Sequence, residues 1–487
     1  MPQVFRITSI VLFIKILLPE GPIQFNMPVP NLTTGNIQRA ILRMTFLLIP
    51  GMISLVILNL TDTFFVARLG TDPLTGISFT FPIIFLVGQA SLGLGTGLTA
   101  SAAAAIGRKR HHLARAQSSI AITLTFTLTA FLIPILILID RPILKLLGAN
   151  NLPLELAESY MTVWFIGIPF FVTTIIANAA IRATGDTWSS SIPMIVAAII
   201  NVVLDPLLIF GLLFFPKLGI TGAAVATVFS RFIALLIALH FLYHKSKLLG
   251  RPPLIIKHII YNLRQILHPA IPTTIMKTVL ALSISIVTAI IASFSEDAVA
   301  AYGVGARFQA FFALPTVALS IVILAFASQN HAAKQHHRVK IAFRFTHQLA
   351  IAWGIFSLIL LNLFAVPLTN LFTQDPEVHR ALIDFLRIAP LGYAQLALVI
   401  IISNELVGIG RPYAGATIGL LKHVFLYALL IYLGGLLLGI PGLFWGMVAT
   451  NTIIAIIAAI YLRLTFKPST TPQKNILMFH EDDPTNP

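Results

Sequence analysis

The sequence contains no cysteine and has few charged residues. Without cysteine there can be no disulfide framework, no thiolate metal site and no cysteine nucleophile. Asp, Glu, Lys and Arg together make up 10% of the 487 residues, whereas soluble domains contain about 25%. Hydrophobic residues make up 57%. A soluble fold cannot bury that much apolar surface, so we expect most of the chain to face lipid.

The sequence also lacks the features of an enzyme or an ATP-driven pump. It has neither an Asp-rich metal motif nor a His-Glu zinc motif, and no soluble segment is large enough to bind ATP. The glycine-rich run at 93–97 lies inside an apolar segment, where it indicates close helix packing and not a nucleotide loop. We therefore expect no enzyme activity and no cofactor. Since no segment could bind ATP, any active transport by this chain would have to be driven by an ion gradient.

Long apolar segments divide the chain into potential membrane spans, each of which needs about 20 residues. Twelve segments qualify: 44–67, 77–106, 117–139, 156–182, 189–214, 219–243, 266–293, 298–328, 343–371, 381–407, 412–434 and 440–463. Interior prolines such as Pro82 and Pro193 are tolerated in membrane helices as kinks. The sequence predicts an all-α membrane protein with 12 transmembrane helices.

The positions of lysine and arginine predict the orientation. Twelve spans place both termini on one side of the membrane, and 22 of the 32 Lys and Arg residues lie on that side, against five on the other. We therefore expect a multi-pass protein of the plasma (inner) membrane with cytoplasmic N- and C-termini. The net charge of +15 is then a topology signal, with contact to anionic lipid as a second possibility. A nucleic-acid partner is not expected, because the basic clusters are short loops between spans.

The sequence repeats at an interval of 225 residues. This shift aligns His111 with His336, Lys109 with Lys334 and Gly185 with Gly410. Because each half has six spans, both halves enter the membrane in the same direction and form a parallel pseudo-two-fold repeat. We expect an N-terminal cytoplasmic extension at 1–40, lobes at 41–243 and 266–463, a basic linker at 244–265 and a C-terminal cytoplasmic tail at 464–487. Transporters often place substrate sites at such a repeat interface.

Two carboxylates lie deep in the first predicted lobe, and intramembrane carboxylates are costly and often functional. At 1.5 Å per residue, Asp62 and Asp205 lie roughly 10–15 Å below the outer surface. Thr227 falls at a similar depth, and Asn201 lies one turn from Asp205 on the same helix face. We expect these four residues to form an ion- or proton-coupling site, with Na⁺ as the only metal considered.

The second lobe lacks matching carboxylates, since the shift maps Asp62 to Val287 and Asp205 to Leu430. Fold maintenance should apply to both halves, whereas a coupling site need not. The alternative is that hydrogen bonds neutralise both carboxyl groups, which then only hold helices together.

Other polar residues within the spans are weaker candidates. Lys277, Arg307 and Lys422 make the second lobe basic, for contact with anionic groups or with helix-end carbonyls. Glu405 lies near Arg411, so we expect it to snorkel or to form a pair with that residue. The candidates for a substrate cavity are Asn178, Lys277, Arg307 and Glu405.

Several motifs resemble those of the multidrug and toxic compound extrusion (MATE) transporters, over about residues 40–465. They are DTFFVARLG at 62–70, RATGDT at 182–187, NVVLDPLLIF at 201–210, GITGAAVAT at 219–227, AAYG at 300–303 and Gln329-Asn330. The resemblance implies two six-helix lobes around a V-shaped cavity. It also implies export of amphipathic, often cationic compounds by H⁺ or Na⁺ antiport. A single chain with both lobes can work alone, so we expect a monomer.

The resemblance is closest to the DinF-like branch, in which Asp62, Asn201, Asp205 and Thr227 match the first-lobe coupling positions. The NorM-like branch usually has a glutamate in span 7, where this chain has Lys277. The second choice of function is a flippase for a lipid-linked oligosaccharide or a related anionic lipid, from the same wider superfamily. The basic residues of the second lobe favour it, whereas the twelve spans and the first-lobe carboxylates count against it.

Overall fold

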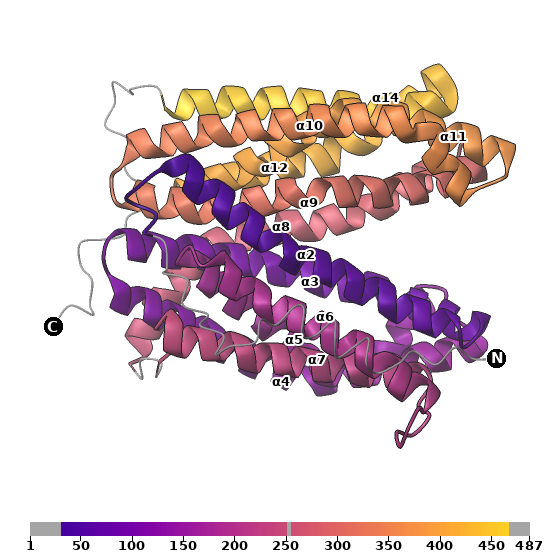
Figure 1. The fold of residues 1–487 in the computed structure, drawn as a ribbon, viewed down its shortest axis with the longest axis horizontal. Helices are drawn as coiled ribbons and strands as arrows, with labels where there is room; N and C mark the ends of the chain where they lie inside the picture. The colour runs from indigo at the N-terminus through magenta and orange to yellow at the C-terminus, as the bar shows by residue number, and fades with distance from the viewer. Residues whose placement is uncertain (1–30, 251–254, 467–487) are drawn as a thin grey trace.

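The computed structural model describes residues 31–250 and 255–466, and all regular elements in these ranges are helical (Figure 1). They are α2 (Ile37–Ala67), α3 (Thr71–Gly107), α4 (His111–Leu146), α5 (Asn151–Ala183), α6 (Thr187–Phe210), α7 (Ile220–His240), η1 (Phe241–Lys245), α8 (Ile256–Ala292), α9 (Glu296–Ala332), α10 (His336–Phe372), α11 (Pro376–Ile388), η2 (Ala389–Gly392), α12 (Tyr393–Gly408), α13 (Pro412–Leu420), η3 (Leu421–Leu426) and α14 (Tyr427–Thr465). The predicted all-α class is confirmed.

The last apolar stretch of the chain crosses the membrane twice. The described residues contain 11 membrane-length helical stretches, and the last, Pro412–Thr465, has 54 residues. A straight helix of that length would measure about 80 Å, whereas a bilayer core is about 30 Å thick. Gly439 interrupts it with a φ of +64°, and the backbones of Gly434 and Gly442 pack against each other. Because the chain reverses here, the prediction of twelve spans is confirmed.

The spans form two bundles. Figure 1 shows α2 to α7 in one bundle, here called the N-lobe, and α8 to α14 in the other, the C-lobe. Large apolar side chains on the outer helices, such as Phe131 and Leu138 of α4, are exposed and suited to lipid contact. Residues 1–30, 251–254 and 467–487 fall outside the described ranges, so the predicted extension, linker and tail limits stay predictions.

The two ends of the molecule differ in the loops that they carry. One end, here called the basic end, carries the connecting segments 31–36, 108–110, 184–186, 246–250, 333–335 and 409–411. The other, here called the opposite end, carries 68–70, 147–150, 211–219, 293–295 and 373–375. At the basic end Gln117 donates to Gln265 at 2.7 Å, and Gln329 donates to the carbonyl of Ala183 at 2.7 Å. These bonds join the lobes, whose ribbons diverge toward the opposite end (Figure 1).

Small residues of α3 allow the lobes to approach closely. Gly93 packs against Thr274, and Gly97 packs against Ala270, both on α8. The hydroxyl of Thr273 donates to the Gly93 carbonyl at 3.0 Å. The glycine-rich run therefore allows close helix packing, as its sequence predicts, and the packing is at the interface between the lobes.

The first half of α2 lies between the two lobes. Ile41, Met44 and Leu48 of this helix, together with Leu32 of the preceding segment, are buried in the hydrophobic core of the C-lobe. Farther along the same helix, Leu58 and Val66 are buried in N-lobe clusters. Pro50 lies between these two parts. A proline inside a helix removes one backbone hydrogen bond and favours a kink, so α2 is built to bend between its two attachments.

Gly97→Ala tests the packing of the lobes, because a Cβ at this position would lie 2.6 Å from Ala270 Cα. We expect the substitution to lower the unfolding free energy by about 1–3 kcal/mol through overpacking, measured by thermal unfolding in detergent. Gly88→Ala on the same helix is the control, since its Cβ would meet only a ring atom of Phe171 at 3.8 Å. Equal stability of the two variants would contradict close packing at Gly97.

Candidate functional site: a buried polar network in the N-lobe

The four residues predicted to form the coupling site lie together in the N-lobe. Asn201 Nδ2 donates to Asp205 Oδ1 at 3.1 Å and to Thr227 Oγ1 at 3.2 Å. Thr227 Oγ1 in turn donates to Asp62 Oδ2 at 3.2 Å. The network therefore joins α2, α6 and α7 through side chains alone.

Local helix geometry places these side chains. Asn201 and Asp205 are four residues apart on α6 and thus share one face. Asp62 is five residues before the end of α2, and Asp205 is five residues before the end of α6. Thr227 is seven residues into α7. Since these three helix ends all lie at the opposite end, the side chains meet at one depth, roughly 8–11 Å inside it.

The network is buried but incompletely satisfied. Asn201 and Asp205 are fully buried, and Asp62 and Thr227 nearly so. Asp62 Oδ1, Asn201 Oδ1 and Asp205 Oδ2 have no hydrogen-bond donor among the described residues. Buried polar atoms without partners are rare in native proteins and call for an explanation. Three oxygens without donors form a site that a proton or a hard cation would complete.

The two carboxyl groups also lie within hydrogen-bonding reach of each other. An ionised carboxylate accepts hydrogen bonds but cannot donate one. A direct bond between the two groups would therefore require a shared proton. Within the described ranges, no ion pair of 4.0 Å or less joins either carboxylate to a lysine, arginine or histidine.

Tyr160 and Arg231 belong to the same region and were not predicted. The hydroxyl of Tyr160, on α5, lies within hydrogen-bonding reach of Thr227. Arg231 lies one turn after Thr227 on α7 and is close enough to Asp62 to interact electrostatically. Its guanidinium carbon is 5.1 Å from the centre of the Phe171 ring. Counting residues from the helix ends, as was done for the four predicted residues, would also have placed Tyr160 and Arg231 near the network.

The four candidates for a substrate cavity are dispersed. Asn178 is buried in α5, Lys277 is partly buried in α8, and Arg307 is exposed on α9. Glu405 is fully buried inside the C-lobe and has no surface to offer a substrate.

The prediction that Glu405 pairs with Arg411 was wrong. Glu405 pairs with His347 and not with Arg411: its Oε2 is 2.9 Å from His347 Nε2, and its Oε1 accepts from Thr346 at 3.0 Å. His347 lies on α10, 58 residues from Glu405, so the sequence contains no local sign of the contact. This carboxyl group is satisfied on both oxygens, unlike those of the N-lobe network.

Known proteins resemble this chain in both lobes. The MatE family model matches residues 48–207 and 269–433. A protein named FAD transporter from Shewanella oneidensis is 35% identical over 444 residues, which cover 91% of this chain and 94% of that protein. The probable multidrug resistance protein YoeA of Bacillus subtilis is 28% identical over 70% of this chain and 76% of its own length.

Solved structures share the fold. A point mutant of the Vibrio cholerae MATE transporter VcmN aligns with a TM-score of 0.84 and 26% identity, covering 89% of this chain and 98% of that one. A Pyrococcus furiosus transporter of the MOP superfamily aligns with a TM-score of 0.82 at 21% identity, covering 89% and 97%. The two-lobe, twelve-helix architecture is thus confirmed.

Thr227→Val tests the network directly, because valine keeps the shape of threonine but removes the hydroxyl that bridges Asn201 and Asp62. We expect a loss of about 1–3 kcal/mol of unfolding free energy, since both partners would be left buried without it. Thr227→Ser retains the hydroxyl and should be closer to the parent protein. Thermal unfolding in detergent makes the comparison, and a valine variant as stable as the serine variant would contradict the bridging role.

Proposed function

The chain belongs to the MatE family of MATE transporters, and on this premise we propose that it is a secondary active exporter. In the proposed cycle H⁺ or Na⁺ enters the network of Asp62, Asn201, Asp205 and Thr227 from outside the cell. Its entry drives export of a small amphipathic molecule by alternating access.

One observation carries this proposal: two carboxyl groups are buried together and form no ion pair with a cation among the described residues. The oxygens Asp62 Oδ1 and Asp205 Oδ2 have no donor within the described ranges, so the site is incomplete by itself. A proton would allow the carboxyl groups to hydrogen bond to each other. A sodium ion would instead be coordinated by the carboxylate, amide and hydroxyl oxygens. Either ion makes the empty and loaded sites electrostatically different.

The arrangement of the lobes supports entry of the ion from outside. The excess of Lys and Arg at the basic end favours its placement in the cytoplasm. The lobes are hydrogen bonded at that end, and the network lies near the other. We propose that this conformation is outward-facing and loads the coupling ion.

Helix α2 connects the network to the contacts between the lobes. Pro50 divides α2 into a near half, which precedes it, and a far half, which follows it. Asp62 lies in the far half, while Met44 and Leu48 of the near half are buried in the C-lobe core. Loading of Asp62 would change the interactions that hold the far half, and the weak point at Pro50 lets the helix bend in response. An ion shifts the equilibrium between conformations only through such a difference in binding.

Two classes of cargo are consistent with the family. Relatives named for multidrug resistance favour the amphipathic, often cationic compounds expected from the sequence. The relative named FAD transporter favours an anionic, aromatic cargo. A feature of the C-lobe supports the second class: Lys422 is only 4% exposed, and its ammonium lies 5.4 Å from the centre of the Tyr427 ring. Within the described ranges no carboxylate pairs with Lys422.

The segment around Lys422 is also irregular. Leu421–Leu426 forms a π-helical turn, η3. Single π-helical turns inside α-helices are frequent at functional sites. A buried cation beside an aromatic ring on such a turn is suited to a phosphate and a planar ring system. We therefore propose a flavin dinucleotide as the second candidate cargo.

Asp205→Asn tests the coupling role, because an amide cannot exchange a proton and carries no charge for Na⁺. In proteoliposomes with separate H⁺ and Na⁺ gradients and a cationic dye, we expect the variant to fall to the level of protein-free liposomes. Asp72→Asn, at an exposed carboxylate in the first turn of α3, is the matched control. Gradient-driven transport by the Asp205 variant would refute the proposal, and transport by the parent protein without either gradient would favour the lipid flippase.

Lys422→Gln tests the cargo. If the cargo is a flavin dinucleotide, loss of this charge should lower its transport about tenfold, the effect of one charged hydrogen bond, and leave dye transport unchanged. Lys257→Gln, at an exposed lysine of α8, is the control. Equal rates of flavin dinucleotide transport by the two variants would remove Lys422 from cargo binding.

A further inference from the structure

The segment that precedes α2, residues 31–36 and here called the strap, is held by an arginine of the C-lobe. Arg338 of α10 donates to the carbonyls of Leu32 and Thr34 at 3.2 Å and to that of Gly35 at 2.9 Å. The planar guanidinium carries several donors in a fixed arrangement, which suits it to bind several acceptors at once. One side chain of the C-lobe therefore fixes three carbonyls of the strap.

Leu32 attaches the strap in a second way. Asn330 of α9 donates to the Leu32 carbonyl at 3.0 Å and accepts from Arg338 Nε at 3.0 Å. The Leu32 side chain is fully buried in the C-lobe core. On the N-lobe side, a Cβ at Gly185 in the turn between α5 and α6 would lie 3.1 Å from Leu32 Cδ2. Leu32 thus lies between the lobes and contacts both.

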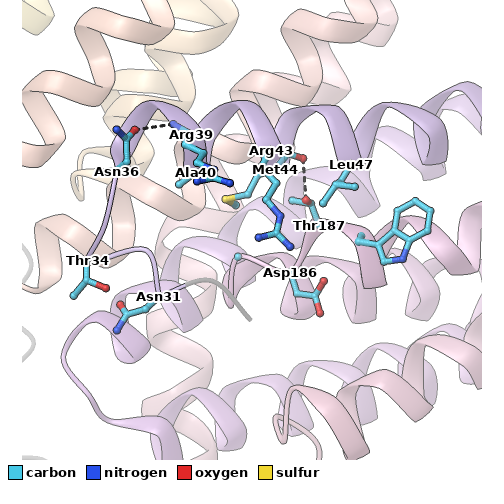
Figure 2. Close-up of a pocket in the computed structure, with 12 residues that line it drawn as sticks. Asn31, Thr34, Asn36, Arg39, Ala40, Arg43, Met44, Leu47, Asp186 and Thr187 are labelled. Carbon is cyan, nitrogen blue, oxygen red and sulfur yellow. Dashed lines mark hydrogen bonds between the residues drawn. The ribbon is translucent and has the colours of Figure 1, made fainter. Parts of the chain in front are cut away.

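A cavity of about 260 Å³ separates the rest of the strap from the N-lobe. Figure 2 shows Asn31 and Thr34 on the segment before α2, and Asp186 across from them in the turn between α5 and α6. The polar contacts of the strap with the C-lobe are therefore close, whereas a space lies between the strap and this turn of the N-lobe.

The start of α2 connects the strap to a part of the helix that the N-lobe holds. Thr187 of α6 donates to the Met44 carbonyl at 2.8 Å (Figure 2). The eight residues between the strap carbonyls and this bond, 36–43, measure about 12 Å as a helix. Fully extended they would reach about 26 Å. The lobes can therefore separate widely at the basic end only if the start of α2 unwinds or if Arg338 releases the strap.

We propose that the strap is a latch, which keeps the basic end closed while Arg338 holds it and leaves Arg338 when the lobes separate there. Unwinding residues 37–43 would cost about one backbone hydrogen bond per residue. Release breaks the four bonds that Arg338 and Asn330 make to the strap. Thr34 and Gly35 are exposed, so water can replace bonds to their carbonyls. Release is therefore the less costly change.

This inference rests on the alternating access of the proposed function, but on neither its coupling ion nor its cargo. The test measures the distance between spin labels on the two lobes by double electron–electron resonance, with the full chain in lipid nanodiscs. Because the chain contains no cysteine, His112→Cys on α4 and Arg463→Cys on α14 direct the labels to two exposed positions of the basic end, one in each lobe.

We expect Arg338→Gln to raise the ratio of separated to closed lobes about tenfold or more, the effect of losing one charged hydrogen bond. Arg344→Gln, at an exposed arginine of the same helix, is the matched control and should leave the ratio at the parent value. An unchanged ratio in the Arg338 variant, or an equal rise in both variants, would overturn the proposal.

A second pair of labels follows the strap itself. Thr34→Cys, at an exposed position of the strap, takes the place of His112→Cys and is combined with Arg463→Cys. In the population with separated lobes we expect this distance to lengthen, because the strap leaves the C-lobe. A constant distance would show that α2 unwinds while the strap stays on Arg338, and the latch would then be refuted.

Leu32→Ala provides a second variant in case Arg338→Gln does not fold. It removes the side chain that lies between the lobes and keeps the carbonyl bonds, so it should shift the ratio in the same direction. A ratio equal to that of Arg344→Gln would count against the latch. The labels report without cargo or an ion gradient. Loss of transport with the expected shift would therefore contradict the proposed function alone, and an unchanged ratio in a protein that transports would contradict the latch alone.

Discussion

The structure depends on the burial of two carboxyl groups next to each other in a lipid-embedded bundle. Asp62 and Asp205 are buried, and within the described ranges no lysine, arginine or histidine lies within 4.0 Å of either carboxylate, although Arg231 interacts with Asp62 from farther away. Burial of an unpaired charge is costly, and two adjacent charges are worse. Such an arrangement persists only if the surrounding helices hold it in place and if a proton or cation can enter. Thr227 and Asn201 supply the fixed hydrogen bonds, and in the proposed function the oxygens left without donors are where the coupling ion binds.

The contrast with Glu405 shows why burial alone does not identify a coupling site. Glu405 is as deeply buried as Asp205, but both of its oxygens have partners, Thr346 and His347. A carboxylate satisfied in this way stabilises the packing of α10 against α12 and gains nothing from another ion. In the N-lobe pair each carboxyl group has a partner on only one of its oxygens. The two lobes have the same six-helix plan, yet one lobe buries an incompletely satisfied acid pair and the other a cation, Lys422.

The sequence predicted the spans, their number and the four network residues because each depends on length and depth along a helix. Asp62, Asp205 and Thr227 could be placed at one level by counting residues from the span ends, and helical spacing added Asn201. The pairing of Glu405 with His347 depends on which helices are neighbours. The position of a residue along its own helix does not contain that information. The reversal at Gly439 was predicted as a span boundary, whereas the π-helical turn at Leu421–Leu426 has no sequence pattern of its own. The attachment of residues 31–36 to Arg338 likewise arises from the packing of distant helices.

Helix α2 is the element through which a local change at the network can reach the interface between the lobes. Its near half is held on one side by the C-lobe core and on the other by α6, where Thr187 and Ser191 donate to the carbonyls of Met44 and Leu47. Its far half carries Asp62. The lobes cannot separate at the basic end unless the near half leaves one of its two neighbours. Because Pro50 divides the halves, the helix can change its near contacts without disrupting the network, and it can respond to the network without unfolding. A rigid α2 would instead have to move as one body, which would break the hydrogen bonds of Asp62 whenever the lobes separate.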